Sequence, residues 1–359
     1  MPTKSKEPNF DITSNMIEHL ENLLAIPAAI NNCDAAADYV QSHAESKGFK
    51  VSRQLDNSVH VVMKGSGRDK RVVGYGAHLD RIALMVSKLH DDGRIEFIPA
   101  GGLWPGHLME GVVADVHTKE GNLPGVISHL EAPIHSLGIK EFENRAQKFE
   151  KLRLRLDALI GYDKKEGKKE LEKLGVRPGQ MIFPQMNLHI DKKHRTLRSR
   201  WLDNTLGCVA LLTLMDWVHA EKTKLKFDMD LIFSVAEEAG KGGSSVHYPE
   251  LTDFISVDVS IGEKADSMKN ALILQNAGHF PYYRKLVDEL EEAAVKSKAN
   301  HDYEVLVGGG TDAEQARVAG FKGRIASLCT PVYGMHSIET ATFDALEGVI
   351  KIMHAHGAK

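Results

Sequence analysis

The chain alternates predicted strands and helices in its first and last parts and breaks this alternation in the middle. After Trp201, the apolar helix "NTLGCVALLTLMDWVHA" is followed by the alternating strand "KFDMDLIFSVAEE", and strands and helices then take turns as far as "TFDALEGVIKIMHAH". Near the N-terminus, two predicted helices precede the strands "VVMKG" and "RVVGYGAHLD". Because such alternation is typical of a helix-covered sheet, we expect an α/β fold with a mixed, mostly parallel sheet flanked by helices.

The middle of the chain has a different character. It is rich in short β-like pieces such as "GVVADVHTKEG" and "LRLRLDALIG", and it contains one charged helix, "KKEGKKELEKLG". An Asp92-Gly93 pair predicts a hairpin turn at its start. We therefore expect a small β-rich domain, residues 83–195, inserted into one α/β domain made of residues 1–82 and 196–359.

Composition narrows the function classes. The formal net charge of -4 and the pI of about 6.5 argue against a nucleic-acid partner, since no basic face is implied. No apolar run approaches the roughly 20 residues that a membrane span needs. The three cysteines are far apart and odd in number, which indicates a reducing compartment rather than a disulfide framework. We expect a cytoplasmic protein with no membrane partner.

Histidine and acidic residues stand at or near the ends of the predicted strands. Open α/β sheets place their sites at the carboxyl ends of parallel strands. His78 and Asp80 end "VVGYGAHLD", and in an extended chain they face the same side. This spacing suits a metal-bound imidazole and a carboxylate that orients it. Taken alone, the HxD pair is better explained by a structural role.

Three further residues each allow an ordinary and a functional interpretation. Asp203 precedes the apolar helix, where it could be an N-cap or a carboxylate that bridges two metal ions with its two oxygens. Asp258 lies in the strand "SVDVS", where a buried charge needs a salt-bridge partner or a metal. His336 follows the strand "GRIASLCTP", and a lone histidine in a loop usually has no special role.

Two adjacent glutamates, Glu237 and Glu238, end the run "LIFSVAEE". They could simply belong to a solvated loop, or one carboxylate could bind a metal while the other handles a proton. The full set offers two histidines, three carboxylates for ligation and one spare glutamate. The four positive charges of two divalent ions would be balanced by three carboxylates and a bridging hydroxide, and two-metal hydrolytic sites hold their ions roughly 3.5–4 Å apart. The spare glutamate would then be the general base.

These stretches resemble, in order along the chain, the motifs of the glutamyl aminopeptidase family of dinuclear-metal aminopeptidases, which includes tetrahedral dodecameric enzymes. The similar stretches are "GAHLDRIALMV", "WLDNTLGC", "FSVAEEAGKGG", "ISVDVS", "GGGTDAEQARVAGF" and "PVYGMHSIET". The resemblance runs from about Asn15 to Ile352. It implies a zinc-peptidase-like catalytic domain interrupted by a small β-rich domain used for dimer formation.

Carried over by position, the resemblance implies five metal ligands: His78, Asp203, Glu238, Asp258 and His336. Asp203 would bridge two divalent ions, with His78 and Asp258 completing one site and Glu238 and His336 the other. Zinc is the expected metal, and cobalt or manganese would also suit these ligands.

The resemblance also assigns roles to residues that do not bind metal. Glu237 would be the general base, and Asp80 would support His78. A cis peptide bond is expected between Asp203 and Asn204. The glycine-rich "VGGGTDAEQ" lacks the phosphate-loop pattern GxxxxGK[ST], and it predicts a tight turn with Thr311 or Asp312 capping the next helix.

The expected function is removal of N-terminal residues from peptides through a metal-bridging hydroxide and the Glu237 base. The expected partners are a peptide substrate and further copies of the chain, in a dimer-based homo-oligomer of which a dodecamer is one form.

An amide or acyl-amino-acid hydrolase using the same two metals is the alternative, because the residues before His336 differ from the family's usual Arg-Tyr. A glycosidase is disfavoured, since its two carboxyls stand about 5–9.5 Å apart across a sugar. A non-enzymatic assembly protein would be expected to have lost a ligand.

Overall fold

The computed structural model describes residues 10–66, 69–107, 111–130, 135, 138–143, 148–162, 165–246 and 250–359. The chain divides into two compact units, one formed by Met1–Arg81 and Leu188–Lys359 and the other by Ile82–Asn187. Among the described helices, none combines the length and apolar character needed to cross a bilayer.

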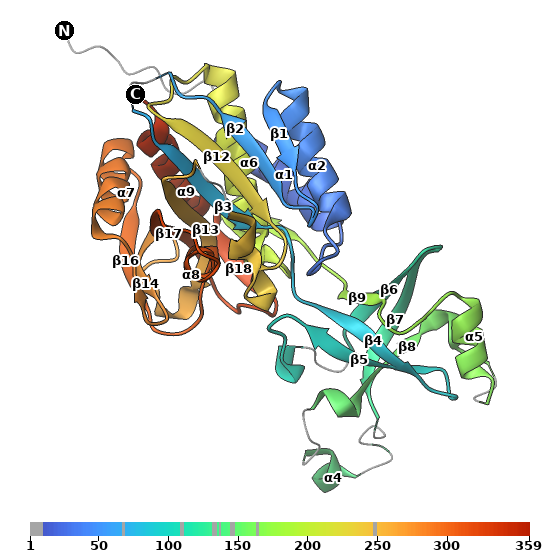
Figure 1. The fold of residues 1–359 in the computed structure, drawn as a ribbon. Helices are drawn as coiled ribbons and strands as arrows, with labels where there is room; N and C mark the ends of the chain where they lie inside the picture. The colour runs from blue at the N-terminus through green and yellow to red at the C-terminus, as the bar shows by residue number, and fades with distance from the viewer. Residues whose placement is uncertain are drawn as a thin grey trace. The chain divides into compact units, whose positions relative to one another are not determined.

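The first unit is built on a nine-stranded mixed sheet in the order β1-β2-β12-β3-β13-β17-β14-β15, with β16 paired to β14 (Figure 1). Pairing is parallel across the four central strands and between β14 and β16, and antiparallel toward both edges. The expectation of a mixed sheet is confirmed, but the parallel part is limited to these pairs. The strands are β1 (Lys50–Arg53), β2 (Val59–Met63), β3 (Val72–His78), β12 (Asp228–Ser234), β13 (Asp253–Ile261), β14 (Ala271–Ala277), β15 (Phe280–Pro281), β16 (His301–Leu306) and β17 (Arg324–Val332).

The central strands are buried on both faces. Residues Met229–Ser234 of β12 are buried without alternation, as expected for a parallel strand covered by helices on each side. Helix α6 is buried along most of its length and packs against β3, β13, α1 and α9. The helices of this unit are α1 (Ile12–Ala25), α2 (Asp34–Ser46), α6 (Leu202–Glu221), α7 (Arg284–Ser297), α8 (Asp312–Val318) and α9 (Phe343–Gly357), with the 3-10 turns η4 (Glu237–Ala239), η5 (Gly242–Val246) and η6 (Gly262–Lys264).

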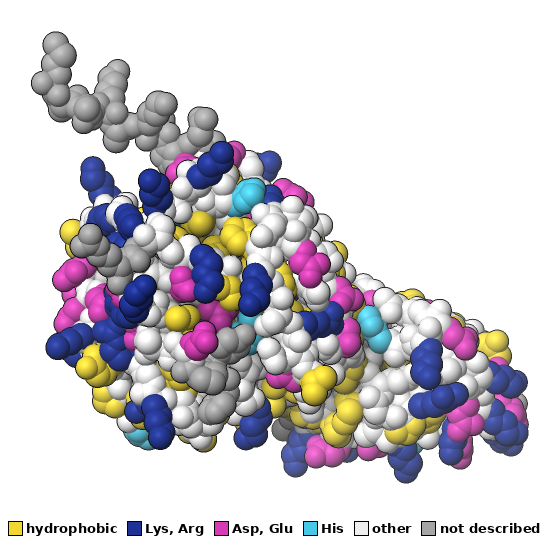
Figure 2. All heavy atoms as spheres, turned by 45° about the horizontal axis from the view of Figure 1, so that its top comes forward, with side chains coloured by type: hydrophobic (Ala, Val, Ile, Leu, Met, Phe, Trp, Pro, Cys, Tyr) yellow, Lys and Arg dark blue, Asp and Glu magenta, His cyan; other side chains and the backbone are white. Residues whose placement is uncertain are grey.

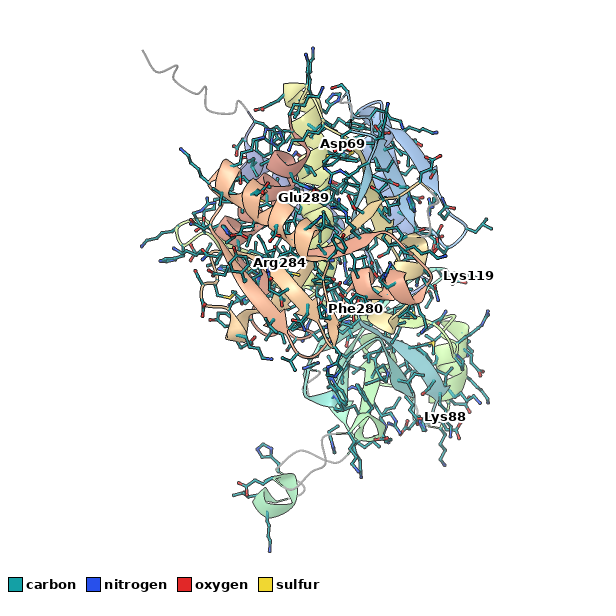
Figure 3. The ribbon with its side chains drawn as sticks, turned by 60° about the vertical axis from the view of Figure 1, so that its left-hand side comes forward. Asp69, Lys88, Lys119, Phe280, Arg284 and Glu289 are labelled. Carbon is teal, nitrogen blue, oxygen red and sulfur yellow. The ribbon has the colours of Figure 1, made fainter. Side chains whose placement is uncertain are left out.

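An ion-pair network ties α7 to the sheet. Glu289, labelled on α7 in Figure 3, accepts hydrogen bonds from Arg71 (2.6 Å), just before β3, and from Arg324 (2.8 Å), the first residue of β17. Arg324 also binds the buried carboxylate of Asp253 at the start of β13 with two nitrogens. The network therefore fixes the amino ends of the central strands, and the opposite ends are left for the candidate site.

A small three-stranded sheet lies beside the start of α6. It pairs β10 (His189–Asp191), β11 (Thr196–Ser199) and β18 (Glu339–Thr342) in antiparallel fashion. Its register sets Ser199 opposite Glu339. Because α6 begins three residues after Ser199, this pairing brings β18 next to the first turn of that helix.

The second unit is a closed barrel in the order β4-β5-β8-β7-β6-β9. The hairpin between β4 and β5 turns at Asp92 and Gly93, as the sequence predicts. Its elements are β4 (Ala83–Leu89), β5 (Arg94–Ala100), η1 (Pro105–His107), β6 (Val113–Thr118), β7 (Gly121–His129), α4 (Ile139–Glu143), η2 (Phe149–Lys151), β8 (Leu152–Leu156), η3 (Asp157–Leu159), α5 (Gly167–Lys173) and β9 (Met181–Pro184).

Charged side chains of both signs are interspersed on the face seen in Figure 2. Helix α5 illustrates the pattern, because Lys169 and Lys173 pair with Glu166 and Glu170 at helical spacing. These exposed pairs keep the helix solvated and contribute little to stability.

Candidate metal centre

The expected ligands lie at the carboxyl end of the parallel strands. His78 is the last residue of β3, and Asp258 lies near the end of β13. Glu238 follows β12 in η4, and His336 follows β17 by a short loop. Asp203 comes from the first turn of α6. Four adjacent parallel strands and one helix therefore supply the five residues, at the edge where open α/β sheets place their sites.

Asp203 stands between the two histidines. Its Oδ1 lies 3.1 Å from Nε2 of His78, and its Oδ2 lies 3.4 Å from Nε2 of His336. The first histidine also lies 3.7 Å from Oδ1 of Asp258, and the second lies 3.6 Å from Oε2 of Glu238. Each oxygen of one carboxylate thus faces a different group of ligand atoms.

The ligand atoms fall into two groups that share Asp203. One group is His78, Asp203 and Asp258, and the other is Asp203, Glu238 and His336; within each group the ligand atoms lie within 4.8 Å of one another. Every member has a nitrogen or carboxylate-oxygen donor, which is the set that zinc and similar divalent ions take. In addition, Oε1 of Glu238 is buried without a hydrogen-bond partner among the described residues. This donor chemistry fits two divalent cations.

The surroundings of Asp203 and Asp258 bear on their ordinary explanations as a helix cap and as one half of a salt bridge. The N-cap position of α6 is occupied by Trp201, and Asp203 lies inside the first turn with non-helical backbone angles. The peptide bond between Asp203 and Asn204 is cis, as predicted. Among the described residues, no lysine or arginine forms a salt bridge with Asp258, whose recorded ion-pair partner is His78. Asp203 is therefore not the helix cap that its place in the sequence suggests, and the ion-pair partner of Asp258 is itself an expected metal ligand.

Glu237 lies beside the two ligand groups. Its Oε2 is 3.8 Å from Nε2 of His78, and its Oε1 accepts a hydrogen bond of 2.7 Å from Nε2 of Gln315 in α8. Burial, reinforced by the charge of Asp258, raises the pKa of Glu237 well above its usual value of 4.5. A carboxyl group with a raised pKa, next to candidate metal ligands, has the properties of a general base.

Asp80 supports this part of the site through its side chain and its backbone. Its two oxygens accept hydrogen bonds of 3.1 Å from the backbone amides of Glu237 and Glu238. Its carbonyl oxygen lies 2.8 Å from Nδ1 of His78, which leaves Nε2 of that histidine facing the carboxylates. Asp80 therefore orients three of the residues expected in the site.

The buried carboxylates of the site repel one another, and cations would relieve this repulsion. Burial and repulsion from Asp203 raise the pKa of Glu238 to about 8, and burial raises the pKa of Asp258. Burial opposes the charged form of His78, but hydrogen bonds to Asp203 and Asp258 outweigh it and raise its pKa. Burial alone would raise the pKa of Asp203, and its hydrogen bonds with His336 and His78 reverse that effect. Several carboxylates in one buried place repel one another unless positive charge joins them.

Sequence reasoning missed three residues next to the site. Glu339 accepts backbone hydrogen bonds from Leu202, Asp203 and His336. Gln315 holds Glu237, and Asp312 hydrogen-bonds Ser234 at the end of β12. Burial raises the pKa of Asp312 to about 7. The signal available in the sequence was that Gln315 and Asp312 lie in the motif "GTDAEQ", and that Glu339 follows His336 by three residues.

Helix α8, which carries Gln315 and Asp312, begins with a well-formed cap. The Thr311 hydroxyl accepts from the amide of Ala313, and the Glu314 carboxylate accepts a hydrogen bond of 2.6 Å from the Thr311 amide, forming a capping box. The prediction that Thr311 or Asp312 caps this helix is confirmed, with Thr311 as the cap. The glycine-rich loop thus serves to start a helix that reaches the candidate site.

A third cluster, His19, His43 and Asp216, brings its ligand atoms equally close but has another explanation. Asp216 accepts hydrogen bonds from His43 (2.9 Å), His19 (3.1 Å) and Asn15 (2.9 Å), and Lys47 lies 3.6 Å away. These donors already satisfy and neutralise the carboxylate. The cluster therefore ties α1, α2 and α6 together as a buried hydrogen-bond network.

The chain is similar to known aminopeptidases over most of its length. The sequence pattern of the M42 glutamyl aminopeptidases matches residues 57–352. The glutamyl aminopeptidase of Lactococcus lactis subsp. cremoris is 22% identical over 294 residues, which cover 79% of this chain and 78% of that protein. The lysyl aminopeptidase of Pyrococcus furiosus is 24% identical over 315 residues, which cover 84% and 85% of the two chains.

Solved structures share the fold. The TET aminopeptidase from the marine sediment archaeon Thaumarchaeota archaeon SCGC AB-539-E09 superposes with a TM-score of 0.85 at 17% identity, over 96% of each chain. The Pyrococcus horikoshii TET1 peptidase, described as able to assemble into a tetrahedron or a large octahedral shell, gives a TM-score of 0.81 at 22% identity, over 95% of this chain and 98% of that one. The family resemblance is confirmed, because the family pattern covers most of the sequence: the chain belongs to the M42 glutamyl aminopeptidase family and is a peptide hydrolase.

Proposed function

We propose that this peptide hydrolase is a two-metal aminopeptidase that removes N-terminal residues from peptides, with Glu237 as its general base. The observation that carries the proposal is the position of Asp203, whose two oxygens lie 3.1 Å and 3.4 Å from different histidine nitrogens. A carboxylate in that position can bridge two cations. Membership of the M42 family supports the aminopeptidase part of the proposal.

The proposed ligands are His78, Asp203 and Asp258 for one ion and Asp203, Glu238 and His336 for the other. When bound, the two cations would supply an acidified water, the bridging hydroxide that the sequence predicts, and would polarise the scissile carbonyl. Zinc suits the nitrogen and oxygen donors, and cobalt or manganese would suit them as well.

The residues of this chain would handle the proton. Oε2 of Glu237 faces the ligand groups, so it is the oxygen that accepts a proton from the attacking water, and Gln315 keeps Oε1 occupied. As the C–N bond breaks, the same carboxyl group returns the proton to the leaving amine, so that the general base is restored at the end of the cycle. Asp80 holds the backbone of Glu237 and Glu238 during both transfers.

The site would be carried by the first unit as the catalytic domain, corresponding to residues 1–82 and 196–359 of the sequence prediction. The β-rich segment, predicted as residues 83–195, would serve dimer formation, and dimers would assemble into a larger homo-oligomer. The assembly described for the Pyrococcus horikoshii TET1 peptidase supports this part of the proposal. A cytoplasmic location stays a prediction.

The proposal is tested with purified full-length chain stripped by a chelator and reloaded with zinc, cobalt or manganese. We expect close to two ions per chain, together with metal-dependent cleavage of aminoacyl-p-nitroanilides. Cleavage of N-acylated compounds but not of their free-amine counterparts would overturn the aminopeptidase proposal in favour of an acyl-amino-acid hydrolase. Full activity in a chain that holds no metal would overturn the proposed chemistry.

A further inference from the structure

Glu339 links two segments that are far apart in the sequence. It is the first residue of β18 and is only 1% exposed. Its Oε2 accepts hydrogen bonds from the backbone amides of Leu202 (2.6 Å) and Asp203 (3.2 Å). Its Oε1 accepts one of 3.0 Å from the amide of His336. One carboxylate therefore holds the backbone of two proposed metal ligands.

The link satisfies buried amides that lie before the regular part of α6. Asp203 and Asn204 have non-helical backbone angles, and the side chain of Asn204 caps the helix beyond them by accepting from the amide of Gly207 (2.9 Å). The amides of Leu202 and Asp203 precede that cap, and buried backbone amides need a hydrogen-bond partner. Glu339 supplies the acceptor, because the register of β11 and β18 sets it opposite Ser199, just before this segment.

The three hydrogen bonds to Glu339 hold more ligands of one proposed cation position than of the other. In the position formed by Asp203, Glu238 and His336, two of the three ligands have their backbone amide held by Glu339. His336 also has a left-handed backbone, with φ of 63°, which is unfavourable for a residue with a side chain unless its surroundings hold it.

The other position depends much less on Glu339. There, His78 is oriented by the carbonyl oxygen of Asp80 (2.8 Å), and Oδ1 of Asp258 accepts from the amide of Val259 (2.9 Å). Only Asp203 is shared between the two positions, and its Oδ1 faces His78 on this side.

We infer that Glu339 is a positioning residue that sets the affinity of the Asp203–Glu238–His336 position selectively. This inference rests on the proposed two-metal function. Glu339 does not touch the reacting atoms. It fixes the positions of the bridging carboxylate and of the His336 imidazole. Mutation of a residue that hydrogen-bonds a metal ligand typically lowers metal affinity by about 10–100-fold.

The test measures stepwise metal binding by full-length Glu339→Gln and Glu339→Ala chains in competition with a chromophoric chelator, and follows cobalt(II) by its visible absorption. Glutamine has the same size but can accept with only one of its two terminal atoms. We expect one ion to bind within about threefold of the wild-type affinity and the other to weaken by about 10–100-fold. Activity of Glu339→Gln should recover as the metal concentration is raised.

Glu263→Gln is the matched control. The exposed Glu263 carboxylate accepts a hydrogen bond of 3.0 Å from the amide of Gly334, which lies in the loop that carries His336. Glu263 does not hold a proposed metal ligand. We expect both of its ions to bind as in the wild type. An equal weakening in Glu263→Gln would overturn the inference, because it would show that any loosening of the loop has this effect.

Three further results would overturn the inference: unchanged affinity for both ions in Glu339→Gln, equal weakening of both, or loss of activity that excess metal does not restore. If Glu339→Ala does not fold, Glu339→Gln carries the test, because it preserves the volume of the buried side chain. Failure of the proposed function looks different, since the wild-type chain itself would then bind fewer than two ions.

Discussion

The side-chain amide of Gln315 donates a hydrogen bond of 2.7 Å to Oε1 of Glu237, while Oε2 of the same carboxylate lies 3.8 Å from the imidazole of His78. The amide oxygen of Gln315 accepts in turn from the backbone of Gly243 (3.3 Å), which fixes the direction of its NH2 group. Glu237 therefore has one oxygen held by α8 and the other directed toward the proposed metal ligands.

Replacing Gln315 by leucine should reduce turnover without removing metal. A hydrogen bond to a charged group contributes about 1.5–3 kcal/mol, so we expect kcat to fall by roughly 10- to 100-fold while KM and metal content stay close to wild type. Steady-state kinetics and metal analysis of the same preparation measure both effects. Val318→Ala, at a position of α8 that is 90% exposed, is the control and should behave as wild type. A Gln315→Leu enzyme with unchanged kcat would contradict the positioning role.

Replacing each of the adjacent glutamates by glutamine should have different effects on turnover and on metal content. Glu237→Gln keeps the volume but cannot take a proton, so we expect kcat to fall by about 10²–10⁴-fold with both metals retained. Glu238→Gln removes a charged ligand, so we expect metal to be lost from one position. Metal analysis beside kinetics distinguishes the two, and equal activity in both variants and the wild type would refute the assignment.

Metal uptake should stabilise the chain and release protons. Because burial and Asp203 hold the pKa of Glu238 at about 8, this carboxyl is largely protonated in the metal-free chain at neutral pH and must lose its proton to bind a cation. We therefore expect the apparent affinity to rise as the pH is raised from about 6 to about 8. Calorimetric titration in buffers of different ionisation enthalpy counts the protons, and thermal unfolding with and without zinc should show a higher Tm for the loaded chain.

Asp216 should make stability depend on pH. Burial alone would raise its pKa, but hydrogen bonds from His19, His43 and Asn15 outweigh burial and hold the pKa well below its usual value of 3.8. Its stabilisation is therefore complete above the unfolded-state pKa and is lost as the pH falls through the lowered folded-state pKa. Asp216→Asn should lower the free energy of unfolding by about 2–4 kcal/mol near pH 7 and by much less in strong acid.

Urea unfolding of the wild type and variant at both pH values measures this difference. Asp38→Asn is a suitable control, because Asp38 is exposed and pairs with Arg53 at the surface. Exposed ion pairs contribute little, so its effect should stay within about 1 kcal/mol. A pH-independent effect of Asp216→Asn would contradict the prediction.

Gly243 should not tolerate alanine. A Cβ at this position would lie 2.1 Å from the backbone nitrogen of Ala316 and 2.4 Å from the carbonyl carbon of Gln315. Because both atoms belong to the backbone of α8, we expect a loss of about 1–3 kcal/mol in the free energy of unfolding, together with reduced turnover as Gln315 shifts. Gly308→Ala, whose added methyl group would have no described neighbour within 4 Å, should unfold as the wild type does. Denaturant unfolding curves of the two variants provide the comparison.

The position of the ligands in the fold was predictable because of how parallel strands are arranged. Once the strands that end at His78, Ser234, Ile261 and Val332 are read as neighbours in a parallel sheet, the residues at and just after their ends must meet at one edge. The role of Asp203 was not fixed in this way, since an aspartate before a helix is an ordinary cap, and only the family resemblance favoured a bridge.

The remaining parts depend on contacts that no local pattern encodes. Gln315 reaches a side chain 78 positions away, and Glu339 joins the nearby amide of His336 to amides that are 136 and 137 positions away. The antiparallel edges of the sheet likewise follow from tertiary pairing, because hydrophobic alternation does not state a strand's direction. The serine before the apolar residues of "SNMIEHLENLLAI" predicts Ser14 as the cap of the first helix, which is wrong: the helix begins at Ile12, and Asp11 is its N-cap and accepts from the amide of Ser14.

The six paired strands of the second unit form a ring in which each has a neighbour on both sides. Recruitment of a further chain by strand addition requires a long row of unpaired backbone groups, and in this ring no described strand has an edge that is wholly unpaired. Side chains and connecting loops would therefore determine which partner binds this unit. Single substitutions there can change the choice of partner and leave the ring of strands intact.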